Sequence, residues 1–219
     1  MSFNYLIFKA KNGRLQSPQH TKFNPNFKEY VNPNSLPSKD MVLSNPSLLL
    51  GRGGVHADYI QASHFAYPSQ WLCSERFREL LELRDTPFSF HRYIGVEHHK
   101  GTKAYCEMRL DEKKRLPPDS ILFDKSKFKL VTQNGEQAIS ISSDDEFSTR
   151  YPRIVNLRLR DDRVGSQDML SIEKFTHIFI NETLKNEIID NKITGFEIYE
   201  NYPDFDYSKR FWSDDFRIY

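Results

Sequence analysis

The chain has too few cysteines for a disulfide-rich protein and too little continuous hydrophobic sequence for a membrane-spanning helix or a signal peptide. Only Cys73 and Cys106 occur among 219 residues, which is too few for a disulfide framework or a cysteine-based zinc site. No segment approaches the roughly 20 apolar residues needed to cross a bilayer. The opening MSFNYLIFKAKNG lacks the basic start, long apolar run and cleavage site of a signal peptide. These absences predict a cytoplasmic protein with reduced thiols.

Net charge is also nearly absent. The 31 basic and 30 acidic side chains leave a formal charge of +1, whereas a general nucleic-acid binder needs a clear positive excess. The two ends of the chain differ. Residues 1–40 carry more basic than acidic groups, and residues 196–219 carry more acidic than basic groups. The sequence therefore predicts an acidic C-terminal end that attracts a basic partner.

Recognisable catalytic motifs are missing. There is no G-x-S-x-G elbow and no H-E-x-x-H motif, and GRGGVHAD (residues 51–58) lacks the lysine and hydroxyl of a P-loop, which favours a tight turn. His91, His98 and His99 stand near Glu97 in the sequence. Adjacent strand residues point to opposite faces, so solvated turn histidines are favoured over a metal or general-base site. We expect no catalytic residue, no cofactor and no metal.

The clearest structural pattern is FTHIFINETLKNEIIDNKITGFEIYE (residues 175–200), which predicts a strand, a capped helix and a second strand. Asn181 offers a side-chain oxygen to the free N–H groups of the helix start, and Glu182 places a negative charge in the first turn. The apolar residues of the helix share one face: Leu184, Ile188 and Ile189.

A second capped helix is predicted in WLCSERFRELLEL (residues 71–83), with Ser74 as the cap and Glu75 in the first turn. The two helices superimpose with Ser74 on Asn181 and Glu75 on Glu182, at an offset of about half the chain. This match indicates two related strand-helix-strand halves, and chance similarity between two capped helices is the alternative.

The remaining segments predict a sheet. Strand character occurs in residues 4–10, 88–99, 104–110, 121–131 and 137–143, and Asn134-Gly135 signals a hairpin between the last two. Alternation places five side chains on one face of a single strand: Phe88, Phe90, Arg92, Ile94 and Val96. Residues 12–46 have five prolines and little periodicity, which is typical of an arm that is either ordered on the surface or mobile until a partner binds.

Together these elements predict an α+β fold with a largely antiparallel sheet of about eight strands and two or three helices. The length fits one domain. Within it we expect an N-terminal strand and proline-rich arm over residues 1–46, a first half over residues 47–118 and a second half over residues 119–219.

The pattern of the second half resembles the bacterial polymorphic-toxin immunity proteins. It is carried by IVNLRLR (residues 154–160), an acidic linker, the short apolar entry at Met169, Leu170 and Ile172, IFINETLKNEII and the TGFEIYE strand; WLCSERFRELLE and ILFDKSKF resemble earlier landmarks of the family. The resemblance implies a small cytosolic protein that binds one cognate toxin domain and occludes its active site. It implies no catalytic residue, no nucleic-acid partner and no membrane partner.

Two acidic regions are the predicted toxin-binding surface. The C-terminal tail interleaves aromatic and acidic residues, a composition suited to binding a basic partner: Asp204, Asp206, Tyr207, Trp212, Asp214 and Asp215. The alternative for this tail is a final strand or arm with its aromatics in the core. The second region is SSDDEF (residues 142–147), which contributes Asp144, Asp145 and Glu146. Asp161 and Asp162 form a similar acidic loop, and both loops are expected to be hydrated linkers of ordinary acidity.

Two other functions remain open at this point. One is an enzyme that modifies nucleotides or peptides through His91, His98 or His99 beside a cleft. The other is an adaptor domain without a toxin partner.

Overall fold

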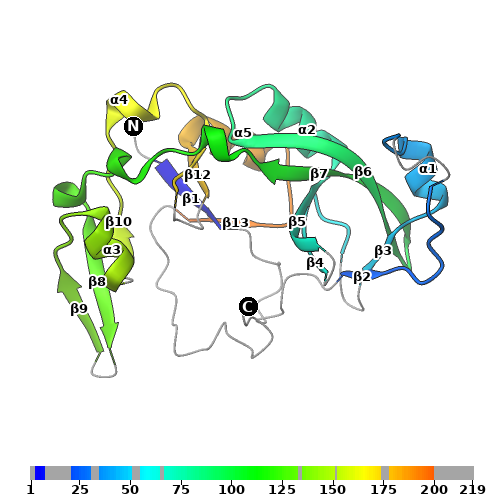
Figure 1. The fold of residues 1–219 in the computed structure, drawn as a ribbon. Coiled ribbons are helices and arrows are strands. Elements are labelled where there is room, and N and C mark those ends of the chain that lie inside the picture. The colour runs from blue at the N-terminus through cyan, green and yellow to red at the C-terminus, as the bar shows by residue number, and fades with distance from the viewer. Residues whose placement is uncertain are drawn as a thin grey trace.

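The computed structural model describes residues 3–7, 21–30, 35–50, 55–64, 67–132, 135–150, 152–173 and 178–199 (Figure 1). The strands are β1 (Phe3–Ile7), β2 (Thr21–Phe23), β3 (Leu48–Leu50), β4 (Tyr59–His64), β5 (Tyr67–Cys73), β6 (Phe88–His98), β7 (Gly101–Leu110), β8 (Lys127–Thr132), β9 (Gly135–Ile139), β10 (Arg153–Asn156), β11 (Met169–Ser171), β12 (Ile178–Asn181) and β13 (Glu197–Tyr199). The helices are α1 (Lys39–Ser44), α2 (Glu75–Glu82), α3 (Asp144–Arg150), α4 (Asp161–Val164) and α5 (Glu182–Asp190), with 3-10 turns η1 (Glu112–Lys114), η2 (Pro118–Ser120) and η3 (Phe123–Lys125). None of the helices in these ranges is both long and apolar enough to span a membrane.

The α+β class with mostly antiparallel strands is confirmed. Every strand pair in the described part is antiparallel except β3 with β6. The two predicted helices are α2 and α5. The structure adds α1, α3 and α4, which have seven residues or fewer and are too short to leave a strong periodic signal.

The largest sheet has the order β2-β3-β6-β7-β5-β4 and curves strongly along the β6–β7 hairpin (Figure 1). Its β6 strand does not keep one face inward. The β6–β7 register shifts between Phe90 and Tyr93, so Phe90 packs toward α2 and α5 while Ile94 and Val96 pack on the opposite face. The predicted single apolar face of residues 88–96 is therefore wrong, because a bulge inverts the alternation halfway along the strand.

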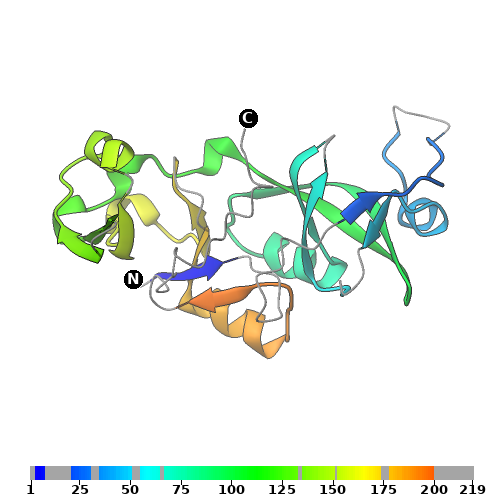
Figure 2. The same cartoon turned by 90° about the horizontal axis from the view of Figure 1, so that it is seen from below.

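A second sheet has the order β11-β12-β1-β13. The N-terminal strand β1 lies between two strands from the far end of the chain, and Tyr5 is paired with both Phe179 and Tyr199 (Figure 2). This pairing closes the domain, because the second half depends on residues 3–7 for its central strand.

Each predicted half contains a strand-helix-strand unit with the same arrangement of strands. In β5-α2-β6 the antiparallel strand β7 lies between β5 and β6, and in β12-α5-β13 the antiparallel strand β1 lies between β12 and β13. Each unit is thus a split βαβ arrangement. The inserted strand of the first unit, β7, follows β6 directly in a hairpin, whereas the inserted strand of the second unit, β1, comes from the N-terminal end of the chain. The strand arrangement of the two units is alike, and their relation as repeated halves stays a prediction.

The β11–β12 pair separates two hydrophobic cores. Met169, Ile178 and Ile180 face the central core with α2 and α5, while Leu170 and Phe179 face the opposite side. This is the two-residue period of a strand buried on both faces. The sheet therefore joins the body of the molecule to a separate packing unit.

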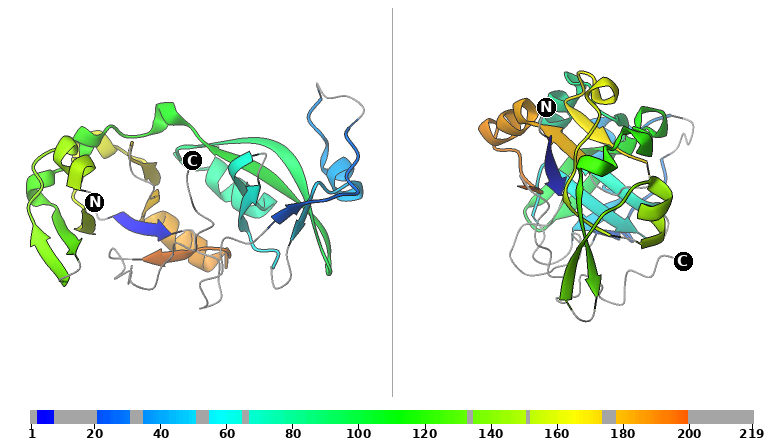
Figure 3. Two further views of the ribbon diagram at one scale, coloured as in Figure 1. Left: turned by 60° about the horizontal axis from the view of Figure 1, so that its bottom comes forward. Right: turned by 90° about the vertical axis from the view of Figure 1, so that its left-hand side faces the viewer.

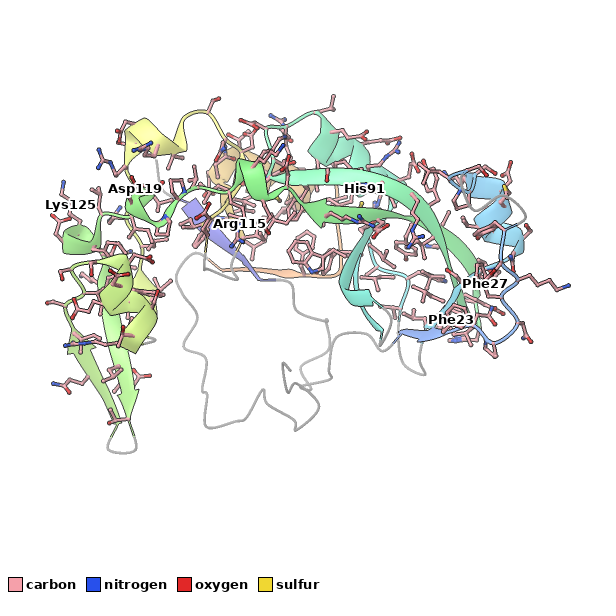
Figure 4. The ribbon with its side chains drawn as sticks, viewed as in Figure 1. Phe23, Phe27, His91, Arg115, Asp119 and Lys125 are labelled. Carbon is pink, nitrogen blue, oxygen red and sulfur yellow. The ribbon has the colours of Figure 1, made fainter. Side chains whose placement is uncertain are left out.

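That unit, which we call the lobe, comprises residues 116–164 with the sheet β10-β8-β9 and helices α3 and α4, and it lies at the opposite end of the molecule from α1 and β2 (Figure 3). It is attached through β11. The Arg115 guanidinium donates to the Ile172 carbonyl oxygen at 2.8 Å, and the Leu116 N–H donates to the Ser171 carbonyl oxygen at 2.8 Å (Figure 4). Asp119 pairs with Arg163 of α4 at 3.3 Å.

The described residues of the proline-rich arm pack on the largest sheet. β2 pairs with β3, and α1 packs against β6. Ser38 caps α1 by accepting from the Met41 N–H at 3.3 Å. Gly95 makes this packing possible, because a Cβ atom there would collide with the Val42 carbonyl oxygen.

Candidate functional site

A cleft of about 910 Å³ opens in the lobe between β8, β9 and the start of α3. Its apolar lining includes Ile121, Leu122, Phe123, Phe128, Ile139 and Ile141. Its polar lining includes Asp124, Lys127, Lys129, Ser142 and Glu146. The mixture of an apolar floor with charges of both signs suits recognition of a protein segment.

The floor is set by Phe128 in the middle strand of the lobe sheet. Phe128 is opposite Ile139 on β9 and Ile154 on β10, so one apolar row crosses all three strands. Its ring centroid lies 6.1 Å from that of Phe123 and 5.8 Å from that of Phe147 on α3. Phe128 itself is buried, whereas Phe123 and Ile139 are half-buried and are among the apolar side chains available to a ligand.

The predicted acidic loop at residues 142–147 is the start of helix α3, so its description as a linker is wrong. Ser143 Oγ accepts from the Glu146 N–H at 3.2 Å, and Glu146 Oε2 accepts from the Ser142 N–H and hydroxyl, both at 2.8 Å. This arrangement is a variant of the capping box, in which the glutamate accepts from Ser142, the residue before the N-cap Ser143. The sequence signal was present as a serine followed three residues later by glutamate.

The three predicted acids consequently differ in their surroundings. The two hydrogen bonds from Ser142 lower the pKa of Glu146, whose Oε1 also pairs with Arg150 at 3.3 Å. Asp145 is exposed, and Asp144 is half-buried in the same first turn. Glu146 lines the cleft and has a structural task, which leaves Asp145 as the acid best placed to meet a partner.

Asp161 and Asp162 likewise begin a helix, α4, rather than forming a loop. The guanidinium of Arg160 donates to Asp162 at 3.3 Å and lowers the pKa of that carboxyl. Neither residue is in the cleft lining. The other predicted contacts, Asp204, Asp206, Tyr207, Trp212, Asp214 and Asp215, lie outside the described residues, as does the GRGG turn.

The three histidines are not brought to one site. His91 hydrogen-bonds to Ser89 Oγ at 3.0 Å in the middle of β6 (Figure 4), about 23 Å along the strand from His98. His98 is buried rather than solvated, with its ring 3.8 Å from that of His99 and 5.7 Å from that of His56. Burial lowers the pKa of His98, and the neighbouring His99 and His56 lower it further. Within the described ranges, no three His, Cys, Asp or Glu side chains are placed to hold a metal.

An exposed aromatic group lies at the other end of the molecule. Phe23 is 48% exposed, and its ring centroid is 5.6 Å from that of Phe27, which is 5.3 Å from Tyr30 (Figure 4). Lys125 in the lobe marks the opposite end of the molecule from this group.

Sequence reasoning missed the cleft, because Phe123, Phe128 and Ile139 were assigned only to strands. No local signal distinguishes a strand residue that lines a cleft from one that faces a core.

Comparison with known protein families finds one match. Residues 38–202, more than half of the chain, match the model of the immunity protein family Imm11. No curated protein and no solved structure matches the chain. The predicted resemblance to immunity proteins is confirmed, and the function that this membership supports in general is immunity to a toxin. The chain belongs to the immunity protein family Imm11.

Proposed function

We propose that this protein binds a cognate toxin domain in the cytoplasm and occludes the active site of that toxin without chemical turnover. The observation that carries the proposal is the family match over residues 38–202. The lobe supports it, because its cleft combines partly exposed apolar side chains with an acidic helix start. Occlusion needs a complementary surface of about 800 Å² on each partner and no catalytic group.

The proposed contact surface is the cleft with Asp144, Asp145 and Glu146 on its α3 side. The acidic aromatic tail, with Asp204, Asp206, Tyr207, Trp212, Asp214 and Asp215, is proposed as a second contact region. Toxins that act on nucleic acids or nucleotides have electropositive active sites, which such acidic regions complement.

The test is coexpression with the toxin domain encoded beside this gene. Growth should be rescued, and the purified proteins should form a complex with nanomolar affinity, about −12 kcal/mol. Toxin activity should fall in proportion to added protein and reach zero at a one-to-one ratio. Complete protection at substoichiometric amounts, with no stable complex, would replace this proposal with an enzymatic antidote.

A further inference from the structure

The outer edge of β9 has no bulge, proline or lysine, which are features that block strand addition. β9 pairs with β8 over five residues without a register shift, and no described strand lies on its other side. Its sequence, GEQAI, contains neither proline nor lysine, and its residues are exposed apart from half-buried Ile139. The Glu136 carboxylate pairs with Lys129 of the neighbouring strand at 3.0 Å. Figure 1 places β9 at the extreme edge of the molecule.

The opposite edge of the same sheet is protected. β10 shows a register shift between Ile154 and Asn156, and it is preceded by Pro152. Bulges and prolines are devices by which proteins prevent edge strands from pairing with other chains. Their presence on β10 and absence from β9 mark one edge of this three-stranded sheet as open.

The backbone groups that face outward can be identified from the register. Thr132 and Gly135 close a two-residue loop, so they form a hydrogen-bonded pair, and the pairs Leu130 with Gln137 and Phe128 with Ile139 follow it in the same phase. Gln137 and Ile139 therefore direct their N–H and C=O groups toward β8. Ala138, between them, directs its N–H and C=O groups away from the sheet.

The open edge runs into the cleft. Ala138, Ile139, Ser140 and Ile141 all line it, so a strand added to β9 would pass the cleft mouth. Alternate side chains of an added strand point to the same face. One of them would reach the apolar surface provided by Phe123 and Ile139.

We infer that the cognate toxin contributes an extended segment that pairs with β9 as a fourth strand and places an apolar side chain in the cleft. This inference rests on the proposed function and names how the partner is held. Main-chain hydrogen bonds supply the affinity of such strand addition, and the cleft selects the side chain.

The test compares Ala138→Pro with Ala138→Val, using a catalytically inactivated toxin domain encoded beside this gene. Proline removes an N–H that does not bond to β8, so the sheet is retained, and its ring blocks an added strand. We expect Ala138→Pro to weaken binding at least about tenfold, and Ala138→Val, which keeps the N–H, to stay within about twofold of the wild type.

Residue-resolved hydrogen exchange of the wild-type protein gives a second readout that does not depend on the proline variant folding. The Ala138 amide should exchange rapidly in the free protein and slowly in the complex, while Gln137 and Ile139 should be slow in both. Strand addition is overturned if the wild type binds the toxin with no change in Ala138 exchange and Ala138→Pro binds as tightly as the wild type. The proposed function would then remain intact. No binding by the wild type overturns the proposed function itself. The inference is also overturned if the protein forms a dimer in the absence of toxin and the Ala138→Pro variant is monomeric. That result would assign this edge to self-association.

Discussion

Asp58 and Thr194 are 136 positions apart, yet the Thr194 N–H and hydroxyl both donate to Asp58 Oδ2, at 2.8 and 2.9 Å. Asp58 Oδ1 accepts from Ser74 Oγ and from Arg76 Nε, both at 2.7 Å. Arg76 also donates to the carbonyl oxygens of Asn191 and Lys192 beyond α5. One buried carboxylate thus joins the start of α2 to the segment that follows α5, and so joins the two halves.

Replacing Asp58 should destabilise the whole domain. Asp58→Asn places an amide N–H₂ among donors that need an acceptor, and we expect the free energy of unfolding to fall by about 3 kcal/mol in urea denaturation. Thr194→Val removes only the hydroxyl and should cost about 1 kcal/mol. Equal effects of the two variants would contradict a central role for the carboxylate.

Asp58 should also contribute to acid sensitivity. Burial raises the pKa of Asp58, but the hydrogen bonds from Arg76, Ser74 and Thr194 outweigh it and lower the pKa to about 2. A carboxyl whose folded pKa lies below its unfolded value stabilises the protein above the unfolded pKa, near 4. This contribution, about 2 kcal/mol, is lost as the pH falls from roughly 5 to 2. Chemical denaturation across this pH range should show that the difference in the free energy of unfolding between the wild type and Asp58→Asn decreases by about 2 kcal/mol.

The parts of the fold that could be predicted are those encoded locally. Ser74 accepts from the Phe77 N–H at 3.3 Å and Asn181 accepts from the Leu184 N–H at 2.9 Å, as their sequence positions indicated. The existence of the β8–β9 hairpin also follows from a local turn signal, but the predicted turn position is off by one residue, because Gly135 pairs with Thr132 and begins β9. Each of these features depends on residues within a few positions of one another.

Features that depend on distant pairing could not be predicted. The insertion of β1 between β12 and β13, and the contacts of Asp58 with Thr194, join segments whose order in space is not encoded in periodicity. The β6 bulge was missed because alternation was assumed to continue through Arg92, a residue that instead bonds to buried Glu107 at 3.1 Å. The cleft is similarly a product of how α3 meets the lobe sheet.

The two helix caps should affect stability without affecting toxin binding. Asn181→Ala and Ser74→Ala should each cost at least about 1 kcal/mol, because each side chain caps its helix and also donates to a carboxylate, Asp168 for Asn181 and Asp58 for Ser74. Ser74→Thr retains the hydroxyl and is the matched control. Thermal or urea unfolding measures the loss, and toxin affinity measured well below the melting range should be unchanged. A large affinity loss with intact stability would place that helix start in the interface.

Phe123 should contribute to toxin affinity, and Phe23 should not. Phe123 is half-buried in the cleft lining, whereas Phe23 is exposed at the opposite end of the molecule. Phe123→Ala should raise the dissociation rate and weaken binding at least about tenfold, while Phe23→Ala should change it less than about twofold. Surface plasmon resonance with folded variants gives both rates. The reverse ranking would move the interface to the aromatic group of Phe23, Phe27 and Tyr30.

Reversing acidic charges should slow association rather than speed dissociation, because rim charges act mainly by steering the partners together. Asp145→Lys tests the exposed position on α3, and Lys substitutions in pairs test the tail acids Asp204, Asp206, Asp214 and Asp215. Each reversal should lower the association rate and flatten its salt dependence. Glu146→Gln is the contrasting variant, since its carboxylate caps α3 and its loss should reduce stability first.

Trp212→Ala and Tyr207→Ala should instead raise the dissociation rate, at a cost of about 2 kcal/mol, if the tail supplies aromatic anchors. Were these truncations to destabilise the free protein by about 3 kcal/mol while the reversals left association unchanged, the tail would belong to the core, and the lobe alone would hold the toxin.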